Sequence, residues 1–355
     1  MLFHKTNKSM EFFLNRQFRI LIFSSFIFMF SCSSQTDRDK FFLKGMIAMD
    51  DKDYEEAIHF FTESYQLDSS FADAINNRGV ALMKKKEYPK ALSDFEKAEA
   101  IREGYFEASK NKALAFQELD KHENTILVLD SLIKTNPDST FLFSTRGVSK
   151  LALSQNESAL LDFQKQLEYS PNDIASLLNI GYITYSNGDY DVAKKSFQKV
   201  IELDKKSALA YNNLGLVYLR ENSFEKSELE FNKALEIDSS HPYFRNNRAL
   251  ALLFLGKLDK ALDDLDISKY YDDKNPLLYR NFSFYFAQNK EFEKAEATLE
   301  KAKSMDENLE GYNFFKAELQ RLEGNIEKAC SFYIKSQKNG EGFHSNAYNC
   351  KTEID

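Results

Sequence analysis

A single 34-residue period runs through most of this 355-residue chain and constrains its fold more than any other feature. A small residue recurs at that interval, with no insertion, at Gly45, Gly79, Ala113, Gly147, Gly181, Gly215, Ala249, Ser283 and Ala317. Twelve places later in each unit stand Ala57, Ala91, Thr125, Ala159, Ala193, Ser227, Ala261, Ala295 and Ala329. Four places beyond these stand Phe61, Phe95, Leu129, Phe163, Phe197, Phe231, Leu265, Leu299 and Tyr333. Such regular units indicate a repeat architecture in which each unit packs against the next.

Each unit has the pattern of two helices that pack against each other. In the fifth unit, Gly181 lets the second helix approach the first closely, and Phe197 fills the space one turn beyond Ala193. Turn-forming residues separate the two helices, as in the segment Ser186–Asp189, and Pro137 stands between two units. One helical hairpin cannot bury its own apolar face, so the stacked units must share a continuous core.

The period resembles that of the tetratricopeptide repeat family, with small residues in the eighth and twentieth places and an aromatic in the twenty-fourth. The stretch Ala208–Gly215 is similar to the first-helix consensus of that family. Thr125 and Ser227 stand where that family usually has alanine, and the chain contains no tryptophan. The resemblance covers about residues 38–343. It implies an all-α, right-handed superhelical solenoid whose first helices line a concave groove for peptides or proteins.

The predicted organisation is a signal peptide at 1–31, a tether at 32–37, nine repeats within 38–343, and a C-terminal cap and tail at 344–355. The predicted repeats are 38–71, 72–105, 106–139, 140–173, 174–207, 208–241, 242–275, 276–309 and 310–343. We expect a short capping helix within residues 340–351, over the open end of the last repeat.

The first 31 residues have the pattern of an export signal. Basic residues precede the uncharged apolar run Ile20–Phe30, which would span about 16 Å as a helix and is too short for a hydrocarbon core of about 30 Å. A basic region followed by a short apolar region is typical of a secretory signal. Met1 and Met10 are both possible starts, since the segment after Met10 is already a complete signal.

The end of this run resembles the lipobox of bacterial lipoproteins. Ser31 directly before Cys32 fits that motif, whereas Met29 and Phe30 depart from its commonest pattern. The resemblance implies that the Cys32 thiol is diacylated and that the chain is cut before it. Acyl chains contribute about 0.8 kcal/mol per buried CH₂ group, so two or three give a stable anchor. We therefore expect an exported lipoprotein of the bacterial cell envelope, at the outer membrane and facing the periplasm; the alternatives are an uncleaved signal anchor and an incidental cysteine.

Asparagine recurs in the sixth place of six units, at Asn77, Asn111, Asn179, Asn213, Asn247 and Asn281. A second asparagine precedes three of them, at Asn76, Asn212 and Asn246. The spacing places these amides in a row along the first helices, where donors and acceptors could hold an extended peptide backbone. The row resembles the asparagine ladder of the O-linked N-acetylglucosamine transferase repeats, which lines a substrate-protein groove. Alternatively, the amides bond only to neighbouring backbone.

An apolar stripe continues the asparagine row along the same face. The ninth places are Met46, Val80, Leu114, Val148, Tyr182, Leu216, Leu250 and Phe284. The twelfth places include Met49, Met83, Leu151, Tyr185, Leu219 and Leu253. Residues three apart share a helix face, so the stripe forms either a groove for apolar side chains or the packing between neighbouring units.

Cys330 and Cys350 are the only thiols besides Cys32. Export permits a disulfide, and a bridge between these two would close a loop of about twenty residues, worth on the order of 3 kcal/mol. Such a bridge would staple the end of the last repeat; the alternative is two buried free thiols.

No residue pattern predicts catalysis, a metal site or a cofactor. The five histidines are scattered, and the chain has no His-Glu-x-x-His, phosphate-binding glycine loop or Cys-x-x-Cys motif. The net charge of −8 disfavours a nucleic-acid partner. The sequence therefore predicts a non-enzymatic scaffold that binds a peptide or protein in its groove. The alternative is a structural subunit of an envelope assembly that uses its convex face or its ends.

Overall fold

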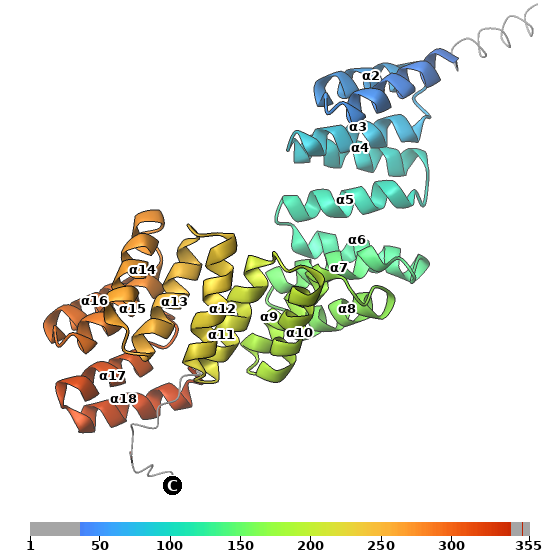
Figure 1. The fold of residues 1–355 in the computed structure, drawn as a ribbon. Coiled ribbons are helices and arrows are strands. Elements are labelled where there is room, and N and C mark those ends of the chain that lie inside the picture. Colours follow the sequence, from blue (N-terminus) through green and yellow to red (C-terminus); the bar gives the residue numbers. More distant parts are fainter. Residues whose placement is uncertain (1–35, 342–349, 351–355) are drawn as a thin grey trace, which may run out of the picture. The chain divides into compact units, whose positions relative to one another are not determined.

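The computed structural model describes residues 36–341 and residue 350, and the predicted all-α repeat solenoid is confirmed in this part of the chain (Figure 1). The predicted signal peptide, Cys32 and nearly all of the predicted cap at 344–355 lie outside the described residues. Every described element is a helix, and no helix among them combines the length and apolar composition needed to cross a membrane.

Each repeat contributes one first helix and one second helix. After the helix through residues 36–50, the first helices are α3 (Ala72–Lys84), α5 (Phe106–Glu118), α7 (Thr140–Ala152), α9 (Ile174–Ser186), α11 (Ala208–Arg220), α13 (Pro242–Phe254), α15 (Pro276–Gln288) and α17 (Tyr312–Glu323). The second helices are α2 (Tyr54–Leu67), α4 (Tyr88–Ile101), α6 (His122–Thr135), α8 (Asn156–Tyr169), α10 (Tyr190–Leu203), α12 (Phe224–Ile237), α14 (Leu258–Tyr271), α16 (Phe292–Met305) and α18 (Ile326–Lys338). The second helices all begin 34 residues apart, which is the period of the sequence.

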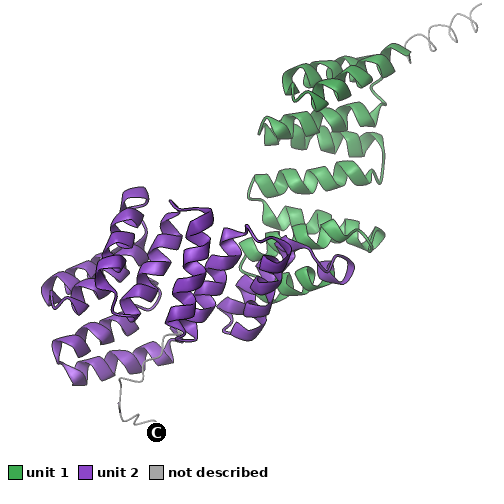
Figure 2. Cartoon of the chain, in the orientation of Figure 1, with its two compact units in different colours: residues 1–165 green, residues 166–355 purple. Residues whose placement is uncertain are grey.

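The chain divides into two compact units, residues 1–165 and residues 166–355 (Figure 2). Within each unit, the second helix of a repeat packs on its own first helix and on the first helix of the next repeat. First helices also contact each other directly, α3 with α5 in the first unit, and α13 with α15 and α15 with α17 in the second.

The two helices of a repeat meet where a glycine faces a phenylalanine ring. A Cβ atom added at Gly215 would lie only 2.6 Å from the ring of Phe231, and the same contact recurs in four other repeats. The four other glycine–phenylalanine pairs are Gly45 with Phe61, Gly79 with Phe95, Gly147 with Phe163, and Gly181 with Phe197. Repeats with alanine or serine in place of the glycine have Leu129, Leu265, Leu299 or Tyr333 in place of the phenylalanine. The small and large positions are therefore complementary in volume in every repeat except the last, where Ala317 stands with Tyr333.

An arginine of the first helix and an aspartate of the second join the helices of three repeats. Arg78 donates through Nε and Nη2 to the two oxygens of Asp94, each at 2.7 Å. The same two-pronged contact joins Arg146 to Asp162 and Arg248 to Asp264. The three aspartates are buried, so these pairs fix the orientation of one helix on the other.

Candidate binding site

The predicted asparagine row forms hydrogen bonds between successive repeats. Asn111 donates to Oδ1 of Asn76 at 3.1 Å, and Asn247 donates to Oδ1 of Asn212 at 2.9 Å. Asn281 donates to Oδ1 of Asn246, the asparagine one repeat earlier, at 2.9 Å. In each case the acceptor is the extra asparagine of the preceding repeat.

The members of the row differ in accessibility. Asn281 and the paired residues Asn246 and Asn212 are buried, with exposed fractions of 0%, 1% and 5%. Asn77 and Asn179 are half-buried and donate to the backbone carbonyl one turn earlier. The half-buried members, rather than the buried ones, are accessible to a ligand in this structure.

The ninth-place residues of the apolar stripe are exposed in the first, fourth and fifth repeats, half-buried in the second and third, and buried in the seventh and eighth. Met46, Val148 and Tyr182 are 38%, 39% and 55% exposed, whereas Leu250 and Phe284 are buried. The later positions join an aromatic cluster that fills the first-helix face of the last repeats. Its rings are Phe254, Phe284, Phe314 and Phe315. Accessible stripe residues therefore remain in both compact units, whereas the chain's own side chains cover the stripe in the last repeats.

A cavity of about 790 Å³ opens within the second compact unit, a volume in the range of ligand pockets. One wall is the end of α9 and the turn after it, including Tyr182 and Tyr190. The other walls are Arg220 of α11, the segment 303–313 before and at the start of α17, and residues 339–341 after α18. Residues more than 100 positions apart therefore face one another here.

Arg220 joins three of these walls. Its Nε donates to the hydroxyl of Tyr185 at 3.0 Å, and its Nη1 donates to the carbonyl of Glu341 at 2.8 Å. Its Nη2 forms an ion pair with the carboxylate of Glu310. The guanidinium thus links α9, the loop before α17 and the segment after α18, and holds the cavity closed on one side.

Glu341 caps the start of α17. Its carboxylate accepts hydrogen bonds from the backbone N–H groups of Phe314, at 3.0 Å, and Asn313, at 3.4 Å, and from the Asn313 amide. The N-terminus of a helix has unsatisfied donors and a positive dipole end. A residue from beyond α18 therefore stabilises the first turn of α17.

A second arginine lies behind this wall. Arg280 is buried and donates to the carbonyl of Glu310 at 2.8 Å, and its guanidinium lies 4.7 Å from the centroid of the Phe315 ring. Burial and, next in size, the neighbouring charge of Arg220 lower the pKa of Arg280 to about 9. At neutral pH it remains protonated, so the wall contains two arginines near one glutamate.

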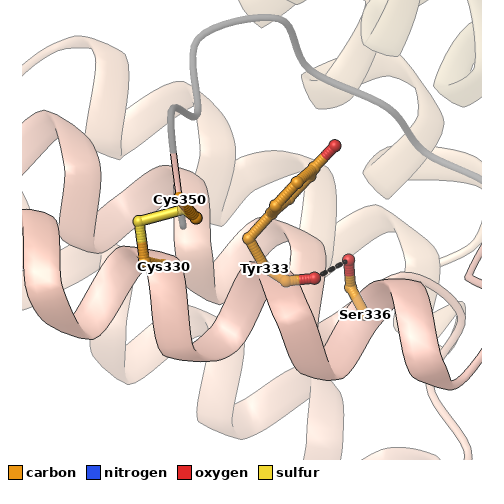
Figure 3. The surroundings of a disulfide bond; sticks show 4 residues. All are labelled: Cys330, Tyr333, Ser336 and Cys350. Atoms are coloured by element: carbon orange, nitrogen blue, oxygen red, sulfur yellow. Dashed lines mark hydrogen bonds between the residues drawn. A yellow bond between two sulfur atoms is a disulfide. The ribbon is translucent and has the colours of Figure 1, made fainter. Parts of the chain in front are cut away.

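A disulfide joins Cys330 of α18 to Cys350, with the Cα atoms 5.5 Å apart (Figure 3). The bridge ties the chain beyond Glu341 back to the last second helix. It therefore limits how far the segment that forms part of the cavity wall can move from α18.

The cavity was not predicted from the sequence, because the residues that line it do not occupy equivalent places in the 34-residue repeat. Tyr182 and Tyr185 belong to the predicted apolar stripe, but Arg220 and the segment 303–313 were not singled out. Among the described residues there is no group of histidine, cysteine or acidic side chains placed to hold a metal ion.

Helical hairpins repeated every 34 residues, with accessible apolar and amide groups along the first helices, define a helical-repeat interaction scaffold. Family models described as tetratricopeptide repeat match residues 42–106 and 208–241, and one described as TPR repeat matches residues 181–222. These parts of the chain are tetratricopeptide repeats. Proteins with such repeats generally serve as non-enzymatic scaffolds for protein–protein interaction.

Two solved structures share the fold. A tetratricopeptide repeat protein from Parabacteroides merdae superposes with a TM-score of 0.57 at 18% identity, covering 70% of this chain and 98% of that one. The APC/C hetero-tetramer Cut9–Hcn1 gives a TM-score of 0.53 at 12% identity, covering 85% of this chain and 73% of that one. Identities this low show the fold alone. No curated protein sequence matches the chain.

Proposed function

We propose that this chain is an exported lipoprotein that binds a peptide or protein partner along the face of its first helices. One observation supports this proposal most directly. Apolar side chains at the ninth place, Met46, Val148 and Tyr182, are exposed at a constant register. Recurrence at one register, rather than exposure of any single residue, is what supports a binding role for this face.

The half-buried asparagines give the same face a polar component. Asn77, Asn179 and Asn213 lie one helical turn from the stripe and retain accessible parts. An amide beside an apolar side chain suits an extended peptide, whose backbone bonds to the amide while its side chains contact the stripe.

Anchoring through acyl chains on Cys32 would hold the array at a membrane of the bacterial cell envelope, with the outer membrane's periplasmic side as the proposed location. The support is the export signal and the Ser31–Cys32 pair. Metabolic labelling with an alkyne fatty acid should mark the wild type and not a Cys32→Ala variant. Labelling that persists in the variant would refute acylation at this cysteine.

Retention of partners tests the binding face. Wild-type protein and a variant with Asn179, Asn213 and Asn247 all changed to alanine are used to retain partners from solubilised envelope, with circular dichroism as the control for folding. The proposal predicts a partner that the wild type retains and a still-helical variant loses. Equal retention by both proteins would argue against the asparagine row as the binding face.

One observation favours the alternative of a structural subunit. Leu127, Leu161 and Leu229 occupy the same register on second helices and are 68%, 66% and 52% exposed. These leucines are available for packing against another subunit through the second-helix face. Loss of an assembly after changing all three to glutamine, with binding by the first-helix face unaffected, would support that role.

A further inference from the structure

Most charged side chains of the cavity in the second unit already contact other groups of the protein. Arg220 pairs with Glu310, and Glu341 caps α17. Lys303 donates to the carbonyl of Glu307 and lies 5.0 Å from the centroid of the Tyr312 ring. An anionic ligand would therefore have to compete with Glu310 for Arg220 and would meet the Glu307 carboxylate.

Apart from the Glu307 carboxylate, the side chains left open in the cavity are uncharged. Among the described residues, no hydrogen-bond partner is found for the hydroxyls of Tyr182 and Tyr190. The same is true of the side-chain amides of Asn187, Asn308 and Asn339. All five groups line the cavity, and each can both donate and accept a hydrogen bond.

Two of the open groups stand on aromatic rings. Tyr182 is 55% exposed. The ring centroid of Tyr190 lies 5.8 Å from that of Tyr185, which also lines the cavity. A tyrosine presents a flat apolar face together with a polar tip. The cavity therefore offers stacking surface beside neutral hydrogen-bonding groups.

We propose that this cavity binds a neutral oligosaccharide. A pyranose ring has a face of C–H groups that stacks on aromatic rings, and a rim of hydroxyls that both donate and accept. The open tyrosines and asparagines match these two features. The cavity shares Tyr182 with the first-helix face, whereas Asn308 and Asn339 of its lining lie outside that face.

The geometry favours an oligosaccharide over an extended peptide. Peptide recognition depends on groups spaced along a line, whereas the open groups here come from the turn after α9, the loop before α17 and the end of α18, and surround one volume. Acidic sugars are disfavoured because Arg220 is already paired and the Glu307 carboxylate adds a negative charge to the lining.

Binding of the full-length protein to a microarray of neutral, sialylated and sulfated oligosaccharides tests the proposal. We expect binding to neutral members, weakened about tenfold or more by Tyr182→Ala and by Asn308→Ala. Tyr243→Ala is the matched control, since Tyr243 is a 48% exposed tyrosine outside the cavity lining. It should leave binding unchanged.

The proposal is overturned if no neutral glycan binds, if only acidic glycans bind, or if the cavity variants bind as the wild type does. Binding of uncharged peptides in place of glycans, lost in Tyr182→Ala, would also overturn it and would assign the cavity to a peptide. Circular dichroism of each variant confirms that a loss of binding is not a loss of fold. Partner retention by the first-helix face is measured separately with Asn308→Ala, because Asn308 lies outside that face and its loss should affect glycan binding alone.

Discussion

At the scale of single residues, volume is matched inside each repeat. Gly181 leaves the space that the Phe197 ring occupies, whereas Ala113 faces the smaller Leu129. Protein interiors are close-packed, so an added methyl group must be offset by a smaller neighbour. The nine repeats show two solutions to the same packing problem, glycine with phenylalanine and alanine or serine with a different large residue.

Changing Gly181 to alanine should lower the free energy of unfolding by about 1–3 kcal/mol, because the new Cβ meets the Phe197 ring. Phe197→Leu alone should also destabilise, by leaving a void. The double variant reproduces the pair present in the third repeat and should cost less than the sum of the two single changes. Urea unfolding of all four proteins measures the coupling. Strict additivity would contradict the volume argument.

The turn between the helices of each repeat contains one residue in the left-handed region. Gly256 has φ 69°, and Lys290 adopts φ 65° at the equivalent place one repeat later. Gly256→Ala should destabilise by about 1 kcal/mol through backbone strain alone, since nothing lies within 4 Å of the new Cβ. Lys290→Gly should stabilise by about 0.5 kcal/mol, because relief of strain exceeds the added entropy of the unfolded chain. Thermal unfolding of both variants measures the two changes in stability. If both variants were stabilised, or both destabilised, the explanation by backbone strain would be contradicted.

At the scale of helices, polar contacts set how one element sits on the next. Asp73 of α3 accepts a hydrogen bond from Nη2 of Arg102, just after α4, at 2.6 Å. It accepts another from the hydroxyl of Tyr105, also at 2.6 Å. Burial raises the pKa of Asp73, but the hydrogen bonds from Arg102 and Tyr105 outweigh it and leave the pKa below the ordinary 3.8. The ionised form therefore stabilises the packing of α3 against the end of α4 and the residue before α5.

The lowered pKa of Asp73 predicts how the free energy of unfolding changes with pH. Its stabilisation is complete above the unfolded pKa of about 3.8 and is lost as the pH falls through the lower pKa of the folded state. Asp73→Asn should therefore reduce the free energy of unfolding at pH 7 and flatten its fall in acid. Asp138→Asn, at an exposed position, is the control. Equal acid profiles for wild type and Asp73→Asn, measured by urea unfolding, would refute this role.

The disulfide belongs to the same scale, because it joins the end of the chain to α18. Cys330→Ser should destabilise the last repeat by about 3 kcal/mol, and hydrogen exchange should accelerate in α17, whose first turn Glu341 caps. Reductant should reproduce this effect in the wild type and add nothing in the variant. Unchanged exchange in α17 would show that the cap does not depend on the bridge.

At the scale of the molecule, the period predicted the fold because each repeat contains the same small and large positions, from Gly45 with Phe61 to Gly215 with Phe231. The cavity could not be predicted in this way. Its contact between Arg220 and Glu341 joins residues 121 positions apart, and no repeated register specifies it. The asparagine row was found in sequence, but its bonds between repeats depend on which neighbour each amide reaches in the packed array.

The central claim is that a partner binds the first-helix face, and photo-crosslinking in living cells tests it most directly. A photoreactive amino acid is placed at Met46, Val148 or Tyr182 on that face, and at Leu127, Leu161 or Leu229 on the second helices as matched controls. All six side chains are exposed and the second-helix set is on the whole the more accessible, so greater accessibility would not explain adducts from the first-helix set. We predict that the first-helix positions form a discrete adduct with a partner and that the second-helix positions do not. Adducts from the second-helix positions alone would contradict the account and support the structural-subunit alternative.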